Sequence, residues 1–433
     1  MKPKLKTITL GCSKNTVDTQ HLLWQVKDSY DILPEEDEGR ADVLLINTCG
    51  FIGDAKEESI QTILQAAAEK AAGKVGKLLV FGCLSQRYPD ELPGLIPEVD
   101  GWFGARDLNP LVKALGCTPQ GDSRRFLDGP RRPYAYLKIS EGCDRRCSYC
   151  AIPFIRGRHI SVPLEKLEDE ARQLASEGVK ELIVIAQDTT FYGLDLYGKR
   201  CLAQLLRRLS AIDGIEWIRI HYSYPADFPE DVLDEMANNP KVCRYMDIPL
   251  QHVSNPVLAN MHRGVDGKWT RELIRKMRDK VPGVALRTTL IVGHPGETHA
   301  SFQELLRFVA DAKFQRMGAF KYSEEEGTWG AANLKDSVRE STKENRLKQL
   351  MTLQRGISLA YNKSRIGSVV KVLADSFSGG TLVCRSEFES PEVDGEILVR
   401  EFGANVDPRT LVGQFLNVRI LEADEYDLIA KLV

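Results

Sequence analysis

The stretch YAYLKISEGCDRRCSYC, residues 134–150, joins a β-rich segment to three closely spaced cysteines. Residues 134–140 have the composition and alternation of a strand, and Cys143, Cys147 and Cys150 follow directly after it. In a chain without the composition of a disulfide scaffold, such cysteines are more often metal ligands or catalytic groups than disulfide partners. The stretch therefore predicts a strand that leads into a metal-binding loop.

The same strand and helix alternation continues to residue 323. Helical stretches such as 164–176, 202–209 and 301–312 separate the later strand candidates. These further candidates are residues 181–187, 217–223, 245–251, 284–293 and 317–323. Six βα units predict a partial, six-stranded parallel barrel, with the cysteine loop at the C-terminal mouth where βα loops collect active-site groups.

A second parallel α/β pattern occupies residues 1–125. Strand candidates at 5–10, 42–46 and 77–81 are each followed by a loop and a helical pattern. The clearest helix is expected to begin at Asp54, with Glu57 completing a capping box. This region is expected to form an N-terminal α/β domain.

One cysteine follows each of these three strands, namely Cys12, Cys49 and Cys83. The carboxyl ends of parallel strands meet at one edge of a sheet, where open α/β sheets gather their ligand groups. Small buried thiols also occur without function, because free cysteine is among the most buried residue types. Three cysteines at one topological position favour a shared site.

The end of the chain has a different character. A charged helical segment, 342–363, leads into residues 367–433, where alternation with period two predicts a small five-stranded antiparallel β-barrel. Residues 116–133 are rich in turn formers and are expected to be a linker. The expected domains are 1–125, 133–365 and 366–433.

The composition excludes several classes of protein. With 43% hydrophobic and 27% charged residues, the 433-residue chain is an ordinary globular protein. No apolar run approaches the ~20 residues of a membrane span, and residues 1–10 show no secretory signal, so a cytoplasmic location is expected. A net charge of −3 offers no overall basic field for direct nucleic-acid binding.

The three-cysteine loop has two chemical interpretations. A structural zinc site usually has four ligands, and the loop offers only His159, nine residues beyond Cys150. Three thiolates on a 4Fe–4S cluster instead leave one iron with an open position, which is where metal sites carry out chemistry. The loop at a barrel mouth favours the catalytic cluster.

The loop spacing, with Tyr149 before the last cysteine, resembles the radical S-adenosylmethionine superfamily. The stretches GCSKN (11–15) and NTCGFI (47–52) resemble the methylthiotransferases, most of all those that modify an aspartate of the twelfth small-subunit ribosomal protein. Ser13 departs from the proline of many members. The match spans essentially the whole chain, and the terminal barrel is similar to a TRAM domain. Further matching segments are residues 152–157, 249–252, 288–297, 322–328 and 423–428.

This resemblance implies a radical methylthiotransferase with two 4Fe–4S clusters. S-adenosylmethionine serves as methyl donor and as radical source, and the methylthio group goes to the aspartate β-carbon. An electron donor such as flavodoxin or ferredoxin is implied, and no catalytic residue beyond the ligands is identified. The implied cluster ligands are Cys143, Cys147 and Cys150 for one cluster and Cys12, Cys49 and Cys83 for an auxiliary one. The implied S-adenosylmethionine contacts are Tyr149, Gln187, Arg287 and the backbone around Val292.

Two alternatives remain open, a tRNA adenosine methylthiotransferase and a non-enzymatic iron–sulfur electron carrier or scaffold. Residues 366–433 contain six basic and twelve acidic residues. This excess opposes a phosphate backbone and predicts that the terminal barrel docks a basic ribosomal protein. Glu324, Glu325 and Glu326 are expected to be a solvated charge run.

Overall fold

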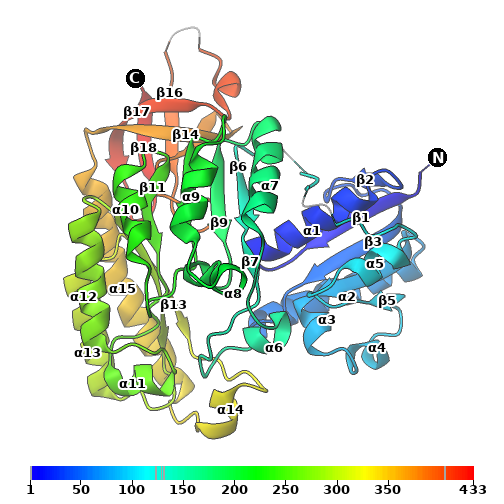
Figure 1. Ribbon diagram of the computed structural model, residues 1–433, viewed down its shortest axis with the longest axis horizontal. Helices are drawn as coiled ribbons and strands as arrows, with labels where there is room; N and C mark the ends of the chain where they lie inside the picture. Colours follow the sequence, from blue (N-terminus) through cyan, green and yellow to red (C-terminus); the bar gives the residue numbers. More distant parts are fainter. Residues whose placement is uncertain (1, 122–123, 128, 130–131, 404–405) are drawn as a thin grey trace.

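The computed structural model describes residues 2–121, 124–127, 129, 132–403 and 406–433. Three main sheets follow one another along the chain, a five-stranded parallel sheet, a six-stranded parallel sheet and a closed five-stranded barrel. A further two-stranded sheet pairs β7 (Ser140–Glu141) with β8 (Ile160–Ser161). Figure 1 shows the arrangement of the three main sheets. The expected fold class is confirmed. Part of the linker expected at residues 116–133 lies outside the described residues.

The N-terminal sheet is parallel and has helices on both faces. The short edge strands β2 and β5 were not expected, because two or three residues show no periodicity. Helices α1 (Ser13–Val26) and α5 (Asn109–Ala114) pack on one face, and α2 (Gly53–Ala71), α3 (Cys83–Arg87) and α4 (Leu92–Leu95) pack on the other. In sheet order the strands are β2 (Asp31–Leu33), β1 (Lys4–Thr9), β3 (Ala41–Thr48), β4 (Val75–Gly82) and β5 (Gly101–Trp102).

The expected capping box at Asp54 is wrong. Helix α2 begins at Gly53, with Ile52 as the N-cap residue and no side-chain cap hydrogen bond. Asp54 therefore lies inside the first turn, where a carboxylate interacts favourably with the helix dipole. At the other end, Gly73 adopts a φ of 78° just beyond the helix, as glycine commonly does after a helix C-terminus.

The central sheet is also parallel, and its two edge strands do not pair with each other. Three strands end at residues 185, 220 and 247, whereas the sequence predicted that they continue to residues 187, 223 and 251. Tyr222 and Gln251 have positive φ angles, which turn the chain away from the sheet into loops at its C-terminal mouth. In sheet order the strands are β13 (Arg316–Lys321), β12 (Ala285–Val292), β11 (Val242–Asp247), β10 (Trp217–Ile220), β9 (Glu181–Ile185) and β6 (Tyr134–Lys138).

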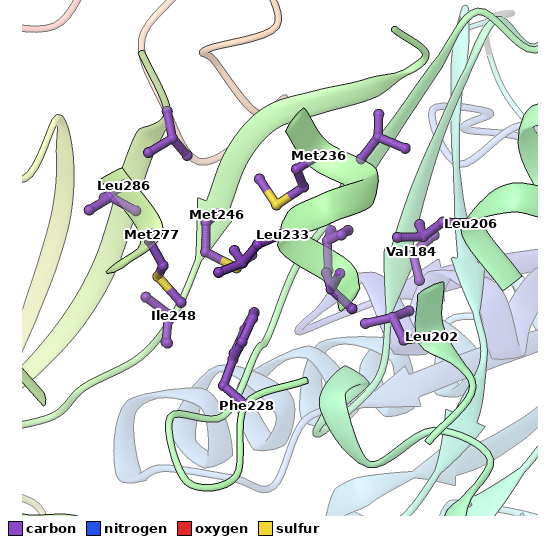
Figure 2. Close-up of a cluster of buried hydrophobic side chains, with 14 of the residues drawn as sticks. Val184, Leu202, Leu206, Phe228, Leu233, Met236, Met246, Ile248, Met277 and Leu286 are labelled. Atoms are coloured by element: carbon purple, nitrogen blue, oxygen red, sulfur yellow. The ribbon is translucent and has the colours of Figure 1, made fainter. Parts of the chain in front are cut away.

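The largest hydrophobic core lies between this sheet and its outer helices. Figure 2 shows part of it, where Met236, Met246 and Met277 pack with Leu233 and Leu286. The outer helices are α7 (Leu164–Ser176), α9 (Leu202–Ser210), α10 (Glu230–Asn238), α12 (Gly267–Lys280), α13 (His299–Ala312) and α15 (Glu340–Ser364). Because strand residues alternate in direction, the remaining side chains fill the inside of the sheet.

The C-terminal barrel is closed and mostly antiparallel, with one parallel pair between β16 and β18. Its core is apolar and separate from the others. The strands are β14 (Val369–Ser378), β15 (Thr381–Arg385), β16 (Ile397–Glu401), β17 (Phe415–Ala423) and β18 (Leu428–Leu432).

Residues 386–395, between β15 and β16, reach the N-terminal end of the central strands. The buried carboxylate of Glu389 pairs with Arg316 at 2.9 Å and with Arg365. Asp394 accepts a hydrogen bond of 2.6 Å from the Tyr245 hydroxyl. The terminal barrel therefore closes this end of the central sheet.

These contacts change the interpretation of the terminal barrel's acidic residues. Six carboxylates pair with arginines of the chain, and Arg385 is occupied by Asp375 and Glu181. The paired carboxylates are Asp375, Glu387, Glu389, Glu392, Asp394 and Glu425. Among the described residues this leaves six carboxylates against five cations. Ion pairs within the chain thus account for most of the acidic excess. The expectation that the terminal barrel docks a basic protein through this excess therefore loses its basis.

No helix in the described ranges is both long enough and apolar enough to cross a bilayer.

Replacing Glu389 by Ala is expected to cost about 3–5 kcal/mol of the free energy of unfolding, because two buried guanidinium groups lose their partner. Glu387→Ala is the matched control. Its pair with Arg244 is partly exposed, so its removal is expected to cost about 0–1 kcal/mol. Urea denaturation measures both. Equal losses for the two variants would contradict the anchoring role of Glu389.

Candidate active site between two cysteine triads

Cys12, Cys49 and Cys83 lie just beyond β1, β3 and β4, at one edge of the N-terminal sheet. We call them the N-terminal triad. Gly11, at a φ of 91°, permits the close approach of two of the loops, since a Cβ there would stand 2.8 Å from the Cβ of Cys49. The structure thus brings together the three thiols that the sequence placed at strand ends.

Asn15 of α1 ties these loops together. Its Nδ2 donates to the carbonyls of Leu10, at 2.8 Å, and Thr48, at 3.2 Å. Burial, against a smaller opposing effect of Arg156, raises the pKa of Cys83 to about 11. The neighbouring thiols raise it further, which is consistent with three cysteines within electrostatic reach of one another.

The second group, Cys143, Cys147 and Cys150, follows β6 and is called the loop triad. The Cys143 amide donates to the Gly157 carbonyl at 3.0 Å, and the Cys150 amide donates to the Cys147 carbonyl at 3.1 Å. Burial is the largest cause that raises the pKa of Cys143 to about 12. All six thiols of the two triads are free.

Arg263 is the cation at the loop triad. Its Nη1 lies 3.4 Å from the Cys147 Sγ and 3.3 Å from the Tyr149 hydroxyl. The guanidinium stacks over the Tyr224 ring at 4.2 Å, and Arg145 lies over the same ring at 4.1 Å. Two cations near the thiols offset the negative charge that ligating thiolates carry.

Arg156 of α6 (Ile152–Arg156) joins the region of the central sheet to the N-terminal triad. It is 3% exposed, and its Nε donates to the Cys83 Sγ at 3.2 Å. Its other nitrogens bind Asn15 at 2.6 Å, Asp18 at 2.7 Å and Glu141 at 3.2 Å. One buried side chain therefore contacts both domains and a cysteine of the N-terminal triad.

A second contact joins the same two parts of the molecule. Glu325 is buried and pairs with Arg87 at 2.9 Å and with Lys56 at 3.0 Å, both from the N-terminal domain. The expectation of a solvated charge run at Glu324, Glu325 and Glu326 is therefore wrong for Glu325. Sequence patterning does not show a partner more than 200 residues away.

The predicted cofactor contacts fall into two groups. Tyr149 lies beside Arg263. Gln187 donates to Glu141 at 2.9 Å, while its buried Oε1 has no partner among the residues that the structure describes. Val292 points into the outer core, so only its backbone faces the strand ends. The structure brings these three to the mouth of the sheet.

Arg287 is not brought to the loop triad. Its guanidinium pairs with Asp247 at 2.9 Å and lies 3.6 Å from Asp394 of the terminal barrel. It stands near the N-terminal end of β12, whereas the loop triad follows the C-terminal end of β6. Its positive charge is thus used inside the sheet.

The donor set fits iron–sulfur clusters. In the described part of the chain, no three His, Cys, Asp or Glu side chains converge on a position for a single metal ion. A 4Fe–4S cluster offers a separate iron atom to each thiolate, so its ligands need not converge. Two groups of three free thiols in partly buried loops suit such a cluster.

Sequence reasoning missed the arginines and Tyr224. Arg145 lies within the cysteine loop and Arg156 lies shortly after it, and basic residues beside metal-binding thiols could have drawn attention to both. Arg263 and Tyr224 lie far from the loop in sequence, and no local pattern marks them.

Comparisons with protein families match the chain in three places. Residues 137–309 match the radical SAM superfamily, residues 4–104 match a family described as the uncharacterized protein family UPF0004, and residues 366–433 match the TRAM domain. The three matches together cover most of the sequence.

Curated relatives match over the full length. A protein of Bacteroides fragilis named ribosomal protein uS12 methylthiotransferase RimO is 50% identical over 100% of both chains. Relatives of the same name from Flavobacterium psychrophilum and Cytophaga hutchinsonii are 50% and 46% identical, over 99% and 100% of this chain and 97% and 98% of theirs.

Solved structures share the fold at low identity. The radical S-adenosylmethionine methyltransferase TsrM of Kitasatospora setae has a TM-score of 0.57 and 15% identity, over 74% of this chain and 72% of its own. The cobalamin-dependent S-adenosylmethionine radical enzyme OxsB has a TM-score of 0.51 and 12% identity, over 82% of this chain and 56% of its own.

Replacing Glu325 by Ala is expected to loosen the contact between the region of the central sheet and the N-terminal domain, because Arg87 and Lys56 lose their shared carboxylate. Amides in residues 322–328 and in α3 should then exchange hydrogen faster, as measured by mass spectrometry. The control is Glu324→Ala, which changes an exposed neighbour. If both variants show the protection of the unaltered protein, the contact does not hold the two parts together.

Proposed function

The chain belongs to the ribosomal protein uS12 methylthiotransferases of the radical S-adenosylmethionine superfamily, and we propose that it attaches a methylthio group to the β-carbon of an aspartate in ribosomal protein uS12. One observation carries the proposal beyond family membership. Two triads of free cysteines lie in the two parts of the molecule that Arg156 joins, and Arg156 contacts Cys83 of the N-terminal triad directly. The arrangement suits a reaction that uses two clusters in succession.

We assign the loop triad to the cluster that binds S-adenosylmethionine and the N-terminal triad to an auxiliary cluster. When bound, the first cluster supplies the electron that cleaves S-adenosylmethionine to a radical able to remove a β-hydrogen, and the second presents the sulfur. The protein's task is then to hold charges and geometry. Arg263 hydrogen-bonds Cys147, which is partly buried, and Arg156 hydrogen-bonds Cys83, which is buried.

For the cofactor we propose contacts from Tyr149, Gln187 and the backbone at Val292. The unpartnered Oε1 of Gln187 is a buried acceptor, which suits the amino group or hydroxyls of a polar ligand. The earlier expectation included Arg287, but its ion pairs with Asp247 and Asp394 occupy it. In its place we propose Arg263, beside Tyr149, as the guanidinium that contacts the cofactor.

A one-electron donor such as flavodoxin or ferredoxin is proposed as a partner, together with a cytoplasmic location. We also propose domains at 1–125, 133–365 and 366–433, since each range contains one of the three sheets. The alternative tRNA substrate is disfavoured by family membership rather than by charge, because the charged groups of the terminal barrel that remain outside the ion pairs are nearly balanced.

The assignment of the triads predicts separable losses. Cys143→Ala, Cys147→Ala or Cys150→Ala should stop formation of 5′-deoxyadenosine, because the cofactor loses its electron source. Cys12→Ala, Cys49→Ala or Cys83→Ala should retain some 5′-deoxyadenosine and lose the methylthiolated product. Iron should fall from about eight to about four per chain in each case, at four irons per cubane. Mass spectrometry of nucleoside and peptide, with iron analysis, measures all three.

Cys117→Ala and Cys201→Ala are matched controls from the N-terminal and central regions, and their iron content should not change. The substrate is tested by incubating the reduced, reconstituted protein separately with uS12 and with tRNA. Methylthio transfer to tRNA and not to uS12 would overturn the substrate proposal. Formation of 5′-deoxyadenosine by the N-terminal triad variants together with undiminished product would overturn the division of roles.

A further inference from the structure

Helix α1 carries a buried cation that the reaction as described does not use. Lys14 lies two residues after Cys12 and is 7% exposed. Its ammonium stands 3.1 Å from the centroid of the Tyr222 ring. Across the described residues it has neither a hydrogen bond nor a carboxylate partner. Buried lysines are normally paired, since removing an ammonium from water is costly, and one aromatic face offsets only part of that cost.

The neighbouring ionic groups have no negative charge to spare. Asp18 and Glu141 share the two cations Lys138 and Arg156, which balances that cluster. Lys14 is therefore one positive charge in excess.

Asp247 and His221, inside the central sheet, do not offset the positive charge of Lys14. Asp247 pairs with Arg287 at 2.9 Å. Burial above all lowers the pKa of His221 to about 3, so the imidazole is neutral near pH 7 and contributes no charge of its own. Among the residues that the structure describes, no carboxylate inside the central sheet pairs with Lys14.

The residue that carries the ring beneath the ammonium has a strained backbone that hydrogen bonds hold in place. Tyr222 has a φ of 58°, which non-glycine residues seldom adopt. Its amide donates to the Asp247 Oδ2 at 3.0 Å, and its carbonyl accepts from the Thr189 amide at 3.1 Å. Such strain is retained where the surrounding structure imposes it, commonly at functional sites. The strained backbone of Tyr222 and the lack of a carboxylate partner for Lys14 among the described residues are separate observations, and both point to a ligand site.

We propose that Lys14 binds the side-chain carboxylate of the substrate aspartate. The inference rests on the proposed function and adds the group that recognises the substrate. The carboxylate carbon is bonded directly to the β-carbon, so holding the carboxylate fixes the reactive carbon to within one bond. Lys14 follows Cys12 on the helix that packs against β6, which places the bound carbon beside the interface of the two triads. The contact is an ion pair and changes no bond.

The methionine carboxylate of S-adenosylmethionine is a second source of the same chemistry. Lys14 belongs to the N-terminal domain and follows a cysteine of the N-terminal triad, whereas the cofactor is assigned to the loop triad. The position therefore favours the substrate, and the experiment separates the two sources.

The test measures the affinity of reconstituted full-length protein for two forms of uS12, one with the target aspartate and one with asparagine in its place. Unaltered protein should bind the aspartate form more tightly by about tenfold or more, as expected for a buried charge-assisted contact. Lys14→Met should bind both forms equally, and Lys14→Arg should restore a preference. Lys27→Met, which removes the same charge at the other end of α1, should keep the full preference.

Three outcomes are decisive against the inference. Equal binding of the two forms by the unaltered protein overturns it without any variant, so misfolding of Lys14→Met cannot hide the result. A preference retained in an iron-replete Lys14→Met overturns it as well. Loss of affinity for S-adenosylmethionine in Lys14→Met, with the preference intact, assigns the ammonium to the cofactor. Absence of any binding or modification of uS12 by the unaltered protein would instead count against the proposed function.

Discussion

A sheet of six parallel strands does not close into a barrel, and the rest of the molecule is arranged around that constraint. The inner face of the central sheet is rich in charged and polar side chains, among them Arg219, Asp247 and Arg287, which must be covered and paired. Residues 386–395 cover its N-terminal end, and α1 packs against its edge strand β6. Both flanking domains thus complete the central one.

This division explains how charge is distributed. The terminal barrel supplies carboxylates to arginines inside the sheet, as in the pairs of Glu389 with Arg316 and Arg365. At the other side, Asp18 of α1 meets Lys138 and Arg156. In both places a buried charge gains a partner from the other part of the molecule, which offsets part of the cost of its burial. The interfaces are therefore structural joints and do not resemble the weaker contacts between freely moving domains.

The sequence predicted the parts of the site that topology determines. Cys12, Cys49 and Cys83 share an edge because parallel strands end there, and the loop triad follows from local spacing. The partners of Arg287 and the burial of Glu325 were not predictable, since each depends on contact with a distant segment. The same limit applies to domain charge, because a composition count does not distinguish a carboxylate facing solvent from one facing an arginine.

Helix α1 connects these features within its first two turns. Asn15 ties the loops of the N-terminal triad, while Lys14 and Asp18, four residues apart, lie on a common face of the helix toward the central sheet. Lys138 and Arg156 of the central region neutralise Asp18, whereas Lys14 has no carboxylate partner among the described residues. Through Asp18, the helix holds the N-terminal domain against the central sheet without a substrate. Lys14 remains as a buried positive charge that a substrate carboxylate can bind. Since Cys12, Lys14 and Asp18 lie at the start of one helix, that helix sets their spacing, and a substrate carboxylate bound at Lys14 would lie close to the N-terminal triad.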